Sequence, residues 1–336
     1  MSTLKDLFAE LSSPRRISLI AHARPDGDAI GSCLALKYYF EKKGHHADVI
    51  VPDEFPDFLN WMKDSDKIYN HQKKTKTCFA ILTKADYIFC CDFNALKRIE
   101  ALGEDIKKMH RATLVMIDHH RDPEHFAKYE LWDHHASSTC ELVYDFILQA
   151  GDESIIDADI ATNIYAGIAM DTGVFQYSNT SSRVHAIAGA LMDYGINIES
   201  IHNNVYNQYG ENRLRFIGYL LSEKLEIIPD CQAALMSISM KDAEKFKLNT
   251  GDKEGIVNLP LTMRDVNIAV LFTEDKDKVK ISFRSKGDIS VDLLAKKYFH
   301  GGGHKNAAGG SAKMTLTETE MYFKNVVPAF LKDAKK

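Results

Sequence analysis

The first part of the sequence alternates short, continuously apolar runs with longer stretches in which apolar residues recur every three or four positions. Short runs rich in β-branched and aromatic side chains are typical of strands buried on both faces, whereas the longer period is that of an amphipathic helix. The predicted strands are Ile17–Ala21, Asp48–Val51, Tyr87–Cys91 and Thr113–Ile117. This alternation predicts a mostly parallel sheet with helices on both faces.

Capping residues mark where several helices begin. A helix is predicted from Ala29 to Lys43, and the pattern Ser138 to Glu141 is a capping box that begins another. Asp157 is the predicted cap of the next helix. Helical periodicity then continues over residues 184–225.

The pattern changes after Pro229, where strands become more frequent. The predicted elements beyond it are strands at Ala233–Met240, Asn267–Phe272 and Val279–Phe283 and a helix at Val291–Lys297. A chain of 336 residues is long enough for two ordinary domains. We therefore predict an α/β protein with an N-terminal domain over residues 1–185, a helical connector over 186–229 and a smaller mixed α/β domain over 230–336.

Composition and charge narrow the class of protein. Hydrophobic residues make up 45% and charged residues 26% of the chain, which is ordinary globular composition. The formal net charge is −5, whereas a protein that coats long nucleic acid usually has a strong basic excess. Any nucleic-acid partner is therefore predicted to be short.

The cysteines and the N-terminus bear on the cellular compartment. None of the six cysteines forms a C-x-x-C pair, and most lie in apolar stretches, which predicts buried free thiols of a reducing compartment. The sequence shows neither a signal-peptide pattern nor an apolar run of the ~20 residues that cross a bilayer. We expect a soluble, cytoplasmic protein that has no membrane partner.

Histidines and aspartates follow three of the predicted strands. His22 comes after the first, Asp92 directly follows the third, and Asp118-His119-His120 follows the fourth. The carboxyl ends of parallel strands meet at one edge of the sheet, where ligands bind, so these side chains are expected to converge. Asp26 and Asp28, near His22, and Asp171, after a predicted helix, complete the candidate set.

Several carboxylates close together repel one another unless a cation lies among them. Imidazole mixed with carboxylate suits Mn²⁺, Zn²⁺ or Fe, and a pair of metal ions sharing a carboxylate is a common device for phosphoryl displacement. The simpler interpretation of Asp26 and Asp28 alone is that they are turn or cap residues before the helix. The occurrence of histidines and aspartates after all three strands together favours a metal site.

The order of these motifs resembles the DHH phosphoesterase superfamily. The segments that carry the resemblance are HARPDGDAIGS (residues 22–32), Asp92, DHH (118–120), DTGVF (171–175) and the stretch VKISFRSKGDISVDLLAKKYFHGGGHKNAAGG (279–310) of its associated C-terminal domain. In length and layout the chain is most similar to the NrnA-type branch, whose members degrade very short RNA and phosphoadenosine phosphate (pAp).

The resemblance implies two divalent metal ions, typically Mn²⁺. It places the first at His22, Asp26 and Asp92, and the second at Asp28, Asp92, His119 and Asp171, so that Asp92 bridges them. Asp92 and His120 are then the catalytic residues, with His120 directed at the scissile phosphate or the leaving oxygen. Asp118 is not expected to bind metal itself but to support the residues that do, as carboxylates next to ligating histidines commonly orient them.

In the C-terminal domain the resemblance implies a phosphate grip made by Arg284, Gly302, Gly303 and His304. Glycines let backbone N–H groups approach an anion, and the arginine fork matches phosphate oxygens. The chain departs from the family at His300, where relatives usually carry glycine. A second triplet, Asp133-His134-His135, repeats the DHH letters but lies too far after Asp92, and we predict that it touches neither metal nor substrate.

The predicted function is two-metal hydrolysis of short oligoribonucleotides, of pAp, or of both. Cleavage of pApA or cyclic-di-AMP is compatible with the same motifs. An inorganic pyrophosphatase or exopolyphosphatase is an alternative, although pyrophosphatases of this superfamily carry a basic signature in place of the GGGH loop. A non-catalytic nucleotide sensor is a third, but no expected ligand is missing. The sequence does not fix the oligomeric state, and a homodimer is compatible with it.

Overall fold

The computed structural model describes residues 3–109, 111–206, 210–248, 251–253 and 255–334. The chain folds into two compact units, Met1–Gln208 and Tyr209–Lys336. Among the described helices, none is both long and apolar enough to cross a membrane. The six cysteines are buried and unpaired, as the sequence predicts.

The first unit is built on a six-stranded sheet in which every neighbouring pair is parallel. Its strands are β1 (Arg16–Ile20), β2 (His46–Val51), β3 (Tyr69–Asn70), β4 (Tyr87–Cys91), β5 (Thr113–Asp118) and β6 (Tyr129–Trp132). Their order is β3-β2-β1-β4-β5-β6, so the chain builds the sheet in one direction from β1 and in the other from β4. The β1–β4 junction is therefore the topological switch point of the sheet.

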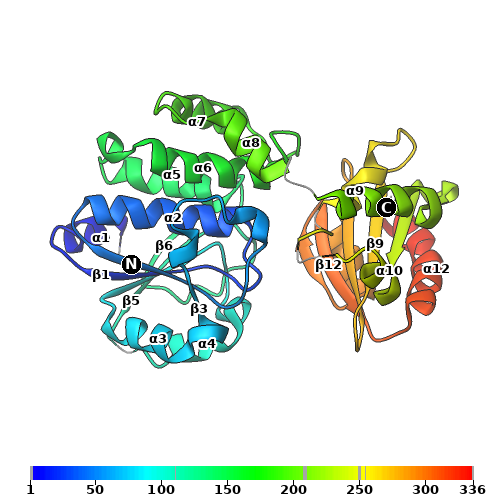
Figure 1. Cartoon of the computed structure of the whole chain (residues 1–336), viewed down its shortest axis with the longest axis horizontal. Helices are drawn as coiled ribbons and strands as arrows, with labels where there is room; N and C mark the ends of the chain where they lie inside the picture. The colour runs from blue at the N-terminus through cyan, green and yellow to red at the C-terminus, as the bar shows by residue number, and fades with distance from the viewer. Residues whose placement is uncertain (1–2, 110, 207–209, 249–250, 254, 335–336) are drawn as a thin grey trace. The chain divides into compact units, whose positions relative to one another are not determined.

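Helices cover both faces of this sheet (Figure 1). One face carries α2 (Gly27–Lys42), α5 (Thr139–Gln149) and α6 (Ala158–Asp171), and the other carries α3 (His71–Lys84) and α4 (Glu100–Ile106). Strand β4 shows why its run is continuously apolar: Phe89 and Cys91 belong to the core on the α2 side, and Ile88 and Cys90 to the core on the α3 side. The remaining helices of the unit are α1 (Leu4–Glu10), α7 (Ser182–Met192) and α8 (Ile198–Tyr206).

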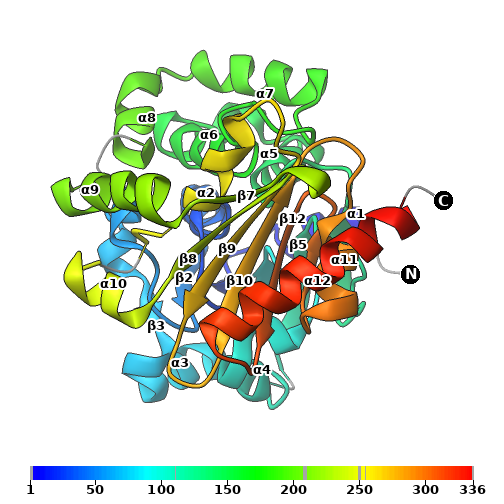
Figure 2. The same cartoon turned by 90° about the vertical axis from the view of Figure 1, so that its right-hand side faces the viewer.

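The second unit contains a mixed sheet of order β11-β12-β10-β9-β8-β7, in which β8 and β9 pair in parallel and the other described neighbours pair antiparallel. Its elements are α9 (Glu211–Tyr219), β7 (Glu226–Ile228), β8 (Ala233–Ile238), α10 (Met240–Lys245), β9 (Ile268–Glu274), β10 (Val279–Ser285), α11 (Val291–Tyr298), β11 (Gly302–His304), β12 (Ala307–Ala312) and α12 (Leu316–Ala334). Helices α11 and α12 pack on one face, as Figure 2 shows for α12. Phe216 of α9 lies in the core on the opposite face.

The predicted fold class, a parallel N-terminal sheet covered by helices and a smaller mixed C-terminal sheet, is confirmed. The helical stretch 184–225 contains α7, α8 and α9, and it crosses the boundary between the two units. Val184 and Val205 belong to the core of the first unit, whereas Phe216 belongs to that of the second. The proposed connector 186–229 therefore contributes helices to both units.

Candidate active site

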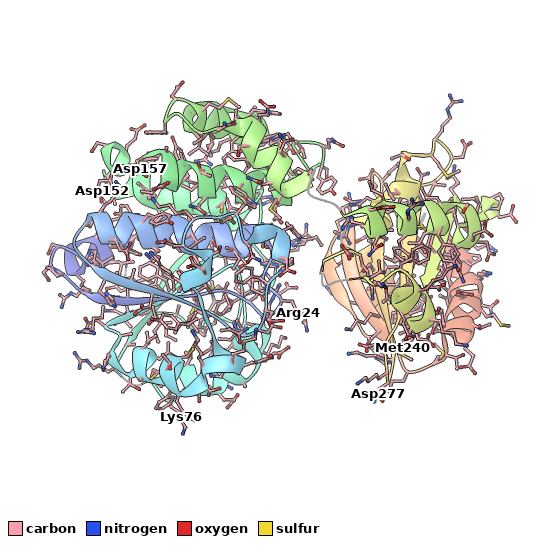
Figure 3. The ribbon with its side chains drawn as sticks, viewed as in Figure 1. Arg24, Lys76, Asp152, Asp157, Met240 and Asp277 are labelled. Carbon is pink, nitrogen blue, oxygen red and sulfur yellow. The ribbon has the colours of Figure 1, made fainter. Side chains whose placement is uncertain are left out.

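The predicted site residues of the first unit lie at the carboxyl edge of its sheet, around the switch point. His22 follows β1 and Asp92 follows β4, the two strands that flank the reversal of strand order. Loops that leave neighbouring strands in opposite directions open a crevice between them. In Figure 3, Arg24 marks the loop that joins β1 to α2.

His22, Asp26 and Asp92 form one group of possible metal ligands, with one ligand atom from each within 4.8 Å of the others. His22 Nδ1 is 2.9 Å from the Ala23 carbonyl oxygen, which leaves Nε2 to face Asp92 Oδ2 at 3.3 Å. Asp26 also caps α2, because its Oδ1 accepts from the N–H groups of Asp28 and Ala29. The cap interpretation of Asp26 and its place in the cluster are thus compatible.

Asp28, His119 and Asp171 form a second group, in which one ligand atom from each residue also lies within 4.8 Å of the others. His119 Nε2 lies 3.4 Å from Asp171 Oδ2 and 3.6 Å from Asp92 Oδ1. The two carboxylate oxygens of Asp92 therefore face different groups, Oδ2 toward His22 and Oδ1 toward His119. This is the arrangement that a bridging carboxylate requires.

His120 approaches the same centre from the end of β5. Its Nδ1 is 2.8 Å from Asp118 Oδ1 and 3.6 Å from Asp92 Oδ1. Asp118 is fully buried, and its Oδ2 has no hydrogen-bond partner among the described residues. The indole N–H of Trp132 donates to the His120 carbonyl oxygen at 2.7 Å, which fixes the backbone of this segment.

Burial and charge shift the protonation of these groups strongly. Burial alone would lower the pKa of His22 and of His119, but the carboxylates around them outweigh it and raise each pKa to about 9. Burial and the charge of Asp92 raise the pKa of Asp28 to about 7, and burial also raises the pKa of Asp171. For Asp92 burial is outweighed by the neighbouring imidazoles, which hold its pKa well below the usual range.

The raised pKa values of His22 and His119 mean that protonated imidazoles offset the negative charge of the neighbouring carboxylates. Divalent ions would supply the same neutralisation and displace those protons, because metal ligands must be deprotonated. A donor set of imidazoles and carboxylates suits Mn²⁺, Zn²⁺ or Fe. The residues present therefore fit a pair of divalent cations.

The N-terminus of α5 holds two of these carboxylates, a contribution that the sequence analysis did not identify. Asp28 accepts from the backbone N–H groups of Thr139, at 2.6 Å, and Cys140, at 2.8 Å. The Thr139 hydroxyl donates to Asp92 Oδ1 at 2.9 Å. The capping pattern predicted the start of α5, with Ser138 bonding the Glu141 N–H, but Glu141 bonds the Ser137 N–H instead of completing the box.

Replacing Thr139 with valine is expected to weaken Mn²⁺ binding or turnover by about ten- to a hundred-fold, the usual effect of losing a hydrogen bond to a ligand. Valine keeps the shape and the backbone N–H but cannot orient Asp92 Oδ1. Thr139→Ser retains the hydroxyl and should behave like the parent. Equal losses in both variants, measured by Mn²⁺ titration and kcat/KM, would contradict this explanation.

The predicted phosphate-binding residues lie together in the second unit. Arg284 on β10 and His304 on β11 are both in register with Ala307 of the intervening strand β12, so the three side chains project from the same face. Their face is opposite to the core formed with α11 and α12, to which Phe283 contributes. The residue between them, Ala307, has a small side chain.

The glycines around this position serve different purposes. A Cβ on Gly301 would lie 1.9 Å from the Gly309 carbonyl oxygen, and one on Gly303 would lie 2.6 Å from the Ala307 carbonyl oxygen, so both allow β11 to pack closely. Gly302 has no such contact below 3.5 Å, so strand packing does not require glycine there. His300 adopts φ +48°, a left-handed conformation that favours the glycine expected from the family pattern, and nothing in the structure explains why this chain carries histidine there.

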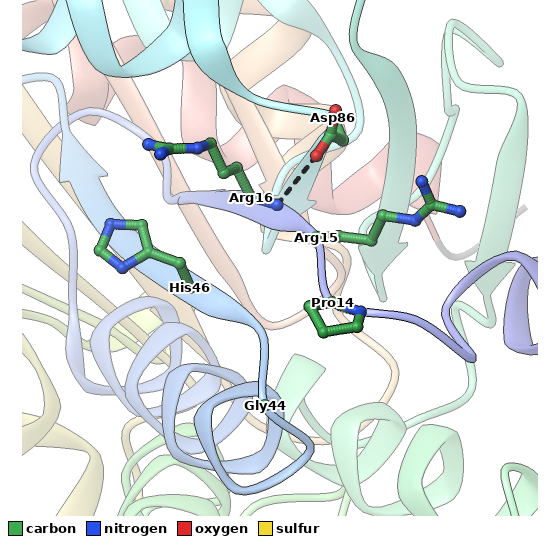
Figure 4. Close-up of a pocket in the computed structure, with 6 residues that line it drawn as sticks. All are labelled: Pro14, Arg15, Arg16, Gly44, His46 and Asp86. Carbon is green, nitrogen blue, oxygen red and sulfur yellow. Dashed lines mark hydrogen bonds between the residues drawn. The ribbon is translucent and has the colours of Figure 1, made fainter.

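A pocket at the opposite end of the strands of the first sheet is lined by Pro14, Arg15, Arg16, Gly44, His46 and Asp86 (Figure 4). Arg16 and His46 begin β1 and β2, and Asp86 precedes β4 and accepts from the Arg16 N–H at 3.0 Å. This pocket lies at the amino ends of the strands, away from the clustered ligands. The triplet Asp133-His134-His135 is exposed and forms a separate group.

Comparisons with known proteins identify the family to which the chain belongs. The N-terminal domain of the DHH family matches residues 16–168, and the DHHA1 domain matches residues 233–336. The chain belongs to the DHH family of phosphoesterases, which are enzymes. It is similar to the bifunctional oligoribonuclease and PAP phosphatase NrnA of Bacillus subtilis (strain 168), with 26% identity over 307 residues that cover 91% of this chain and 92% of the relative.

Two solved structures share the fold. An exopolyphosphatase-related protein from Bacteroides fragilis has 36% identity and a TM-score of 0.95, and the match covers 99% of this chain and 97% of that chain. RecJ from Thermus thermophilus, solved in complex with Mn²⁺, has 12% identity and a TM-score of 0.54, with 98% of this chain and 54% of that chain covered. The second match concerns the fold alone.

Proposed function

We propose that the protein is a two-metal phosphoesterase that hydrolyses short oligoribonucleotides, pAp, or both. The observation that carries this proposal is the position of Asp92, whose two oxygens face two separate groups of imidazole and carboxylate ligands. The similarity to NrnA supports the substrate class. Buried free thiols are consistent with a cytoplasmic location.

The proposed metal ligands are those predicted from the sequence: His22, Asp26 and Asp92 for one ion, and Asp28, Asp92, His119 and Asp171 for the other. When bound, two such ions, which we propose are Mn²⁺, neutralise phosphate charge and lower the pKa of the attacking water. Asp118 orients His120 through Nδ1, so that the other ring nitrogen can hold a proton for the leaving oxygen. Thr139 and the first N–H groups of α5 keep the carboxylates in place.

Substrate length provides the first functional test. The net charge is −5 and the sequence contains no basic track for a long strand, so short oligoribonucleotides should be cleaved faster than long ones at equal concentrations of ends. A product time course on end-labelled di- to pentaribonucleotides, with pAp and pyrophosphate as comparators, measures this preference. Comparable rates on a long single strand would contradict a short-substrate enzyme.

In the second unit we propose that Arg284, Gly302, Gly303 and His304 bind a phosphate of the substrate. Arg284→Ala should lower kcat/KM for an oligoribonucleotide by roughly ten- to a hundred-fold, equivalent to ~1.5–3 kcal/mol for a hydrogen bond to a charged group. The variant should cleave bis-p-nitrophenyl phosphate, which contains no nucleotide and only one phosphate, almost as fast as the parent does.

Lys280→Ala is the matched control for Arg284→Ala. Lys280 is an exposed residue on the same strand, four positions away, and its Nζ pairs with Asp275 Oδ2 at 2.8 Å. We expect that change to leave both substrates unaffected. Equal loss on both substrates in Arg284→Ala, or loss of metal binding, would place Arg284 in the catalytic centre or in the fold instead.

A further inference from the structure

The sequence order predicts no metal at the second triplet, Asp133-His134-His135, but in the structure its side chains form a group with the composition of a metal site, outside the proposed catalytic centre. It directly follows β6, all three residues are exposed, and one ligand atom from each lies within 4.8 Å of the others. Two imidazoles and one carboxylate are a donor set that late first-row ions such as Zn²⁺, Ni²⁺ and Cu²⁺ prefer. The catalytic groups are richer in carboxylate and suit Mn²⁺ better.

Local contacts orient the three side chains. Asp133 Oδ1 accepts from the His135 backbone N–H at 2.8 Å. The His134 ring stacks on Trp132, with centroids 5.4 Å apart and planes 25° apart, and the His135 ring centroid lies 3.9 Å from that of His134. Because neighbouring groups already restrict the donors, less conformational entropy is lost when an ion binds.

The segment is also joined to the DHH motif. The Asp133 N–H donates to the Asp118 carbonyl oxygen at 3.4 Å, and the Trp132 indole N–H donates to that of His120 at 2.7 Å. We propose that Asp133, His134 and His135 bind a late transition-metal ion such as Ni²⁺ or Zn²⁺, distinct from the catalytic pair. Solvent completes its coordination, because the three residues are exposed.

Trp132 makes this site observable. The chain has two tryptophans, and the other, Trp61, packs against the core on the α2 side of the sheet. In a Trp61→Phe background of the full-length protein, emission comes from Trp132 alone. Adding Ni²⁺ to this Mn²⁺-saturated protein should quench the emission saturably, since the ion would bind beside the stacked Trp132 and His134 rings.

The test compares the Trp61→Phe protein with the same protein carrying His134→Ala and His135→Ala, by equilibrium dialysis against Ni²⁺ and by fluorescence. We expect the added changes to remove one bound Ni²⁺ per chain and the quenching, while Mn²⁺-dependent hydrolysis stays unchanged. His119→Ala in the same background should retain the quenching while losing hydrolysis. The same Ni²⁺ stoichiometry with and without His134 and His135, or loss of quenching in His119→Ala, would overturn the proposal.

Discussion

Asp92→Asn is expected to lower hydrolysis severely and to weaken binding of both metal ions. Asp92 is the residue shared by the two ligand groups. The residue is 2% exposed, and the surrounding imidazoles hold the pKa of its carboxyl group well below the usual range. Asparagine has the same shape and tolerates the left-handed backbone of this position, φ +65°, but carries no charge. Losing ~4 kcal/mol of transition-state stabilisation lowers kcat/KM by about 10³-fold.

Asp86→Asn provides a matched control at the other end of the same strand. Asp86 precedes β4 just as Asp92 follows it, and its partners are the Arg16 N–H and Arg111, at the edge of the sheet away from the site. We expect this variant to bind Mn²⁺ and to hydrolyse substrate like the parent. The bridging account is wrong if Asp92→Asn keeps two bound Mn²⁺ per chain and most of its activity.

Removing divalent ions should have an equally large effect. Exhaustive chelation is expected to eliminate hydrolysis of both oligoribonucleotide and bis-p-nitrophenyl phosphate, because the proposed mechanism needs the metal ions to neutralise the phosphate and to activate the attacking water. Adding Mn²⁺ should restore both activities, and Ca²⁺ should restore them poorly, since it prefers all-oxygen ligands. Adding Mn²⁺ should also raise the unfolding temperature, because an ion that binds only the folded state stabilises it.

One result of the chelation experiment would contradict this prediction. Activity that survives removal of all detectable metal would exclude the two-metal mechanism, whatever substrate is used. Asp92→Asn serves as the control for the unfolding measurement. Its melting temperature should respond much less to Mn²⁺ than that of the parent.

The strands that matter most for the site could be predicted from the sequence because their side chains are buried on both faces. Tyr87–Cys91 is predicted with the observed bounds, and β5 is one residue longer than predicted, ending at Asp118. Parallel pairing then brings the residues after β1, β4 and β5 to one edge, which is why His22, Asp92 and His119 could be expected to meet. Their proximity follows from the parallel pairing of the strands and can be predicted without knowing the side-chain conformations.

Other features depend on contacts between distant segments, which local patterns do not contain. Strand β3 has only two residues, and β11 and β12 are rich in glycine and alanine, so they lack the apolar signal of a strand. The capping pattern at Ser138 indicated where α5 begins but not that Thr139 bonds Asp92, 47 positions away. Only the fold reveals that this helix N-terminus faces the carboxylates.

The most direct test of the central claim is anomalous diffraction from crystals of the protein soaked in Mn²⁺. We expect two anomalous peaks in the first unit, one contacting His22 and Asp26 and the other contacting Asp28, His119 and Asp171, with an oxygen of Asp92 bound to each. A single peak, or two peaks that do not share Asp92, would contradict a bridged two-metal phosphoesterase site.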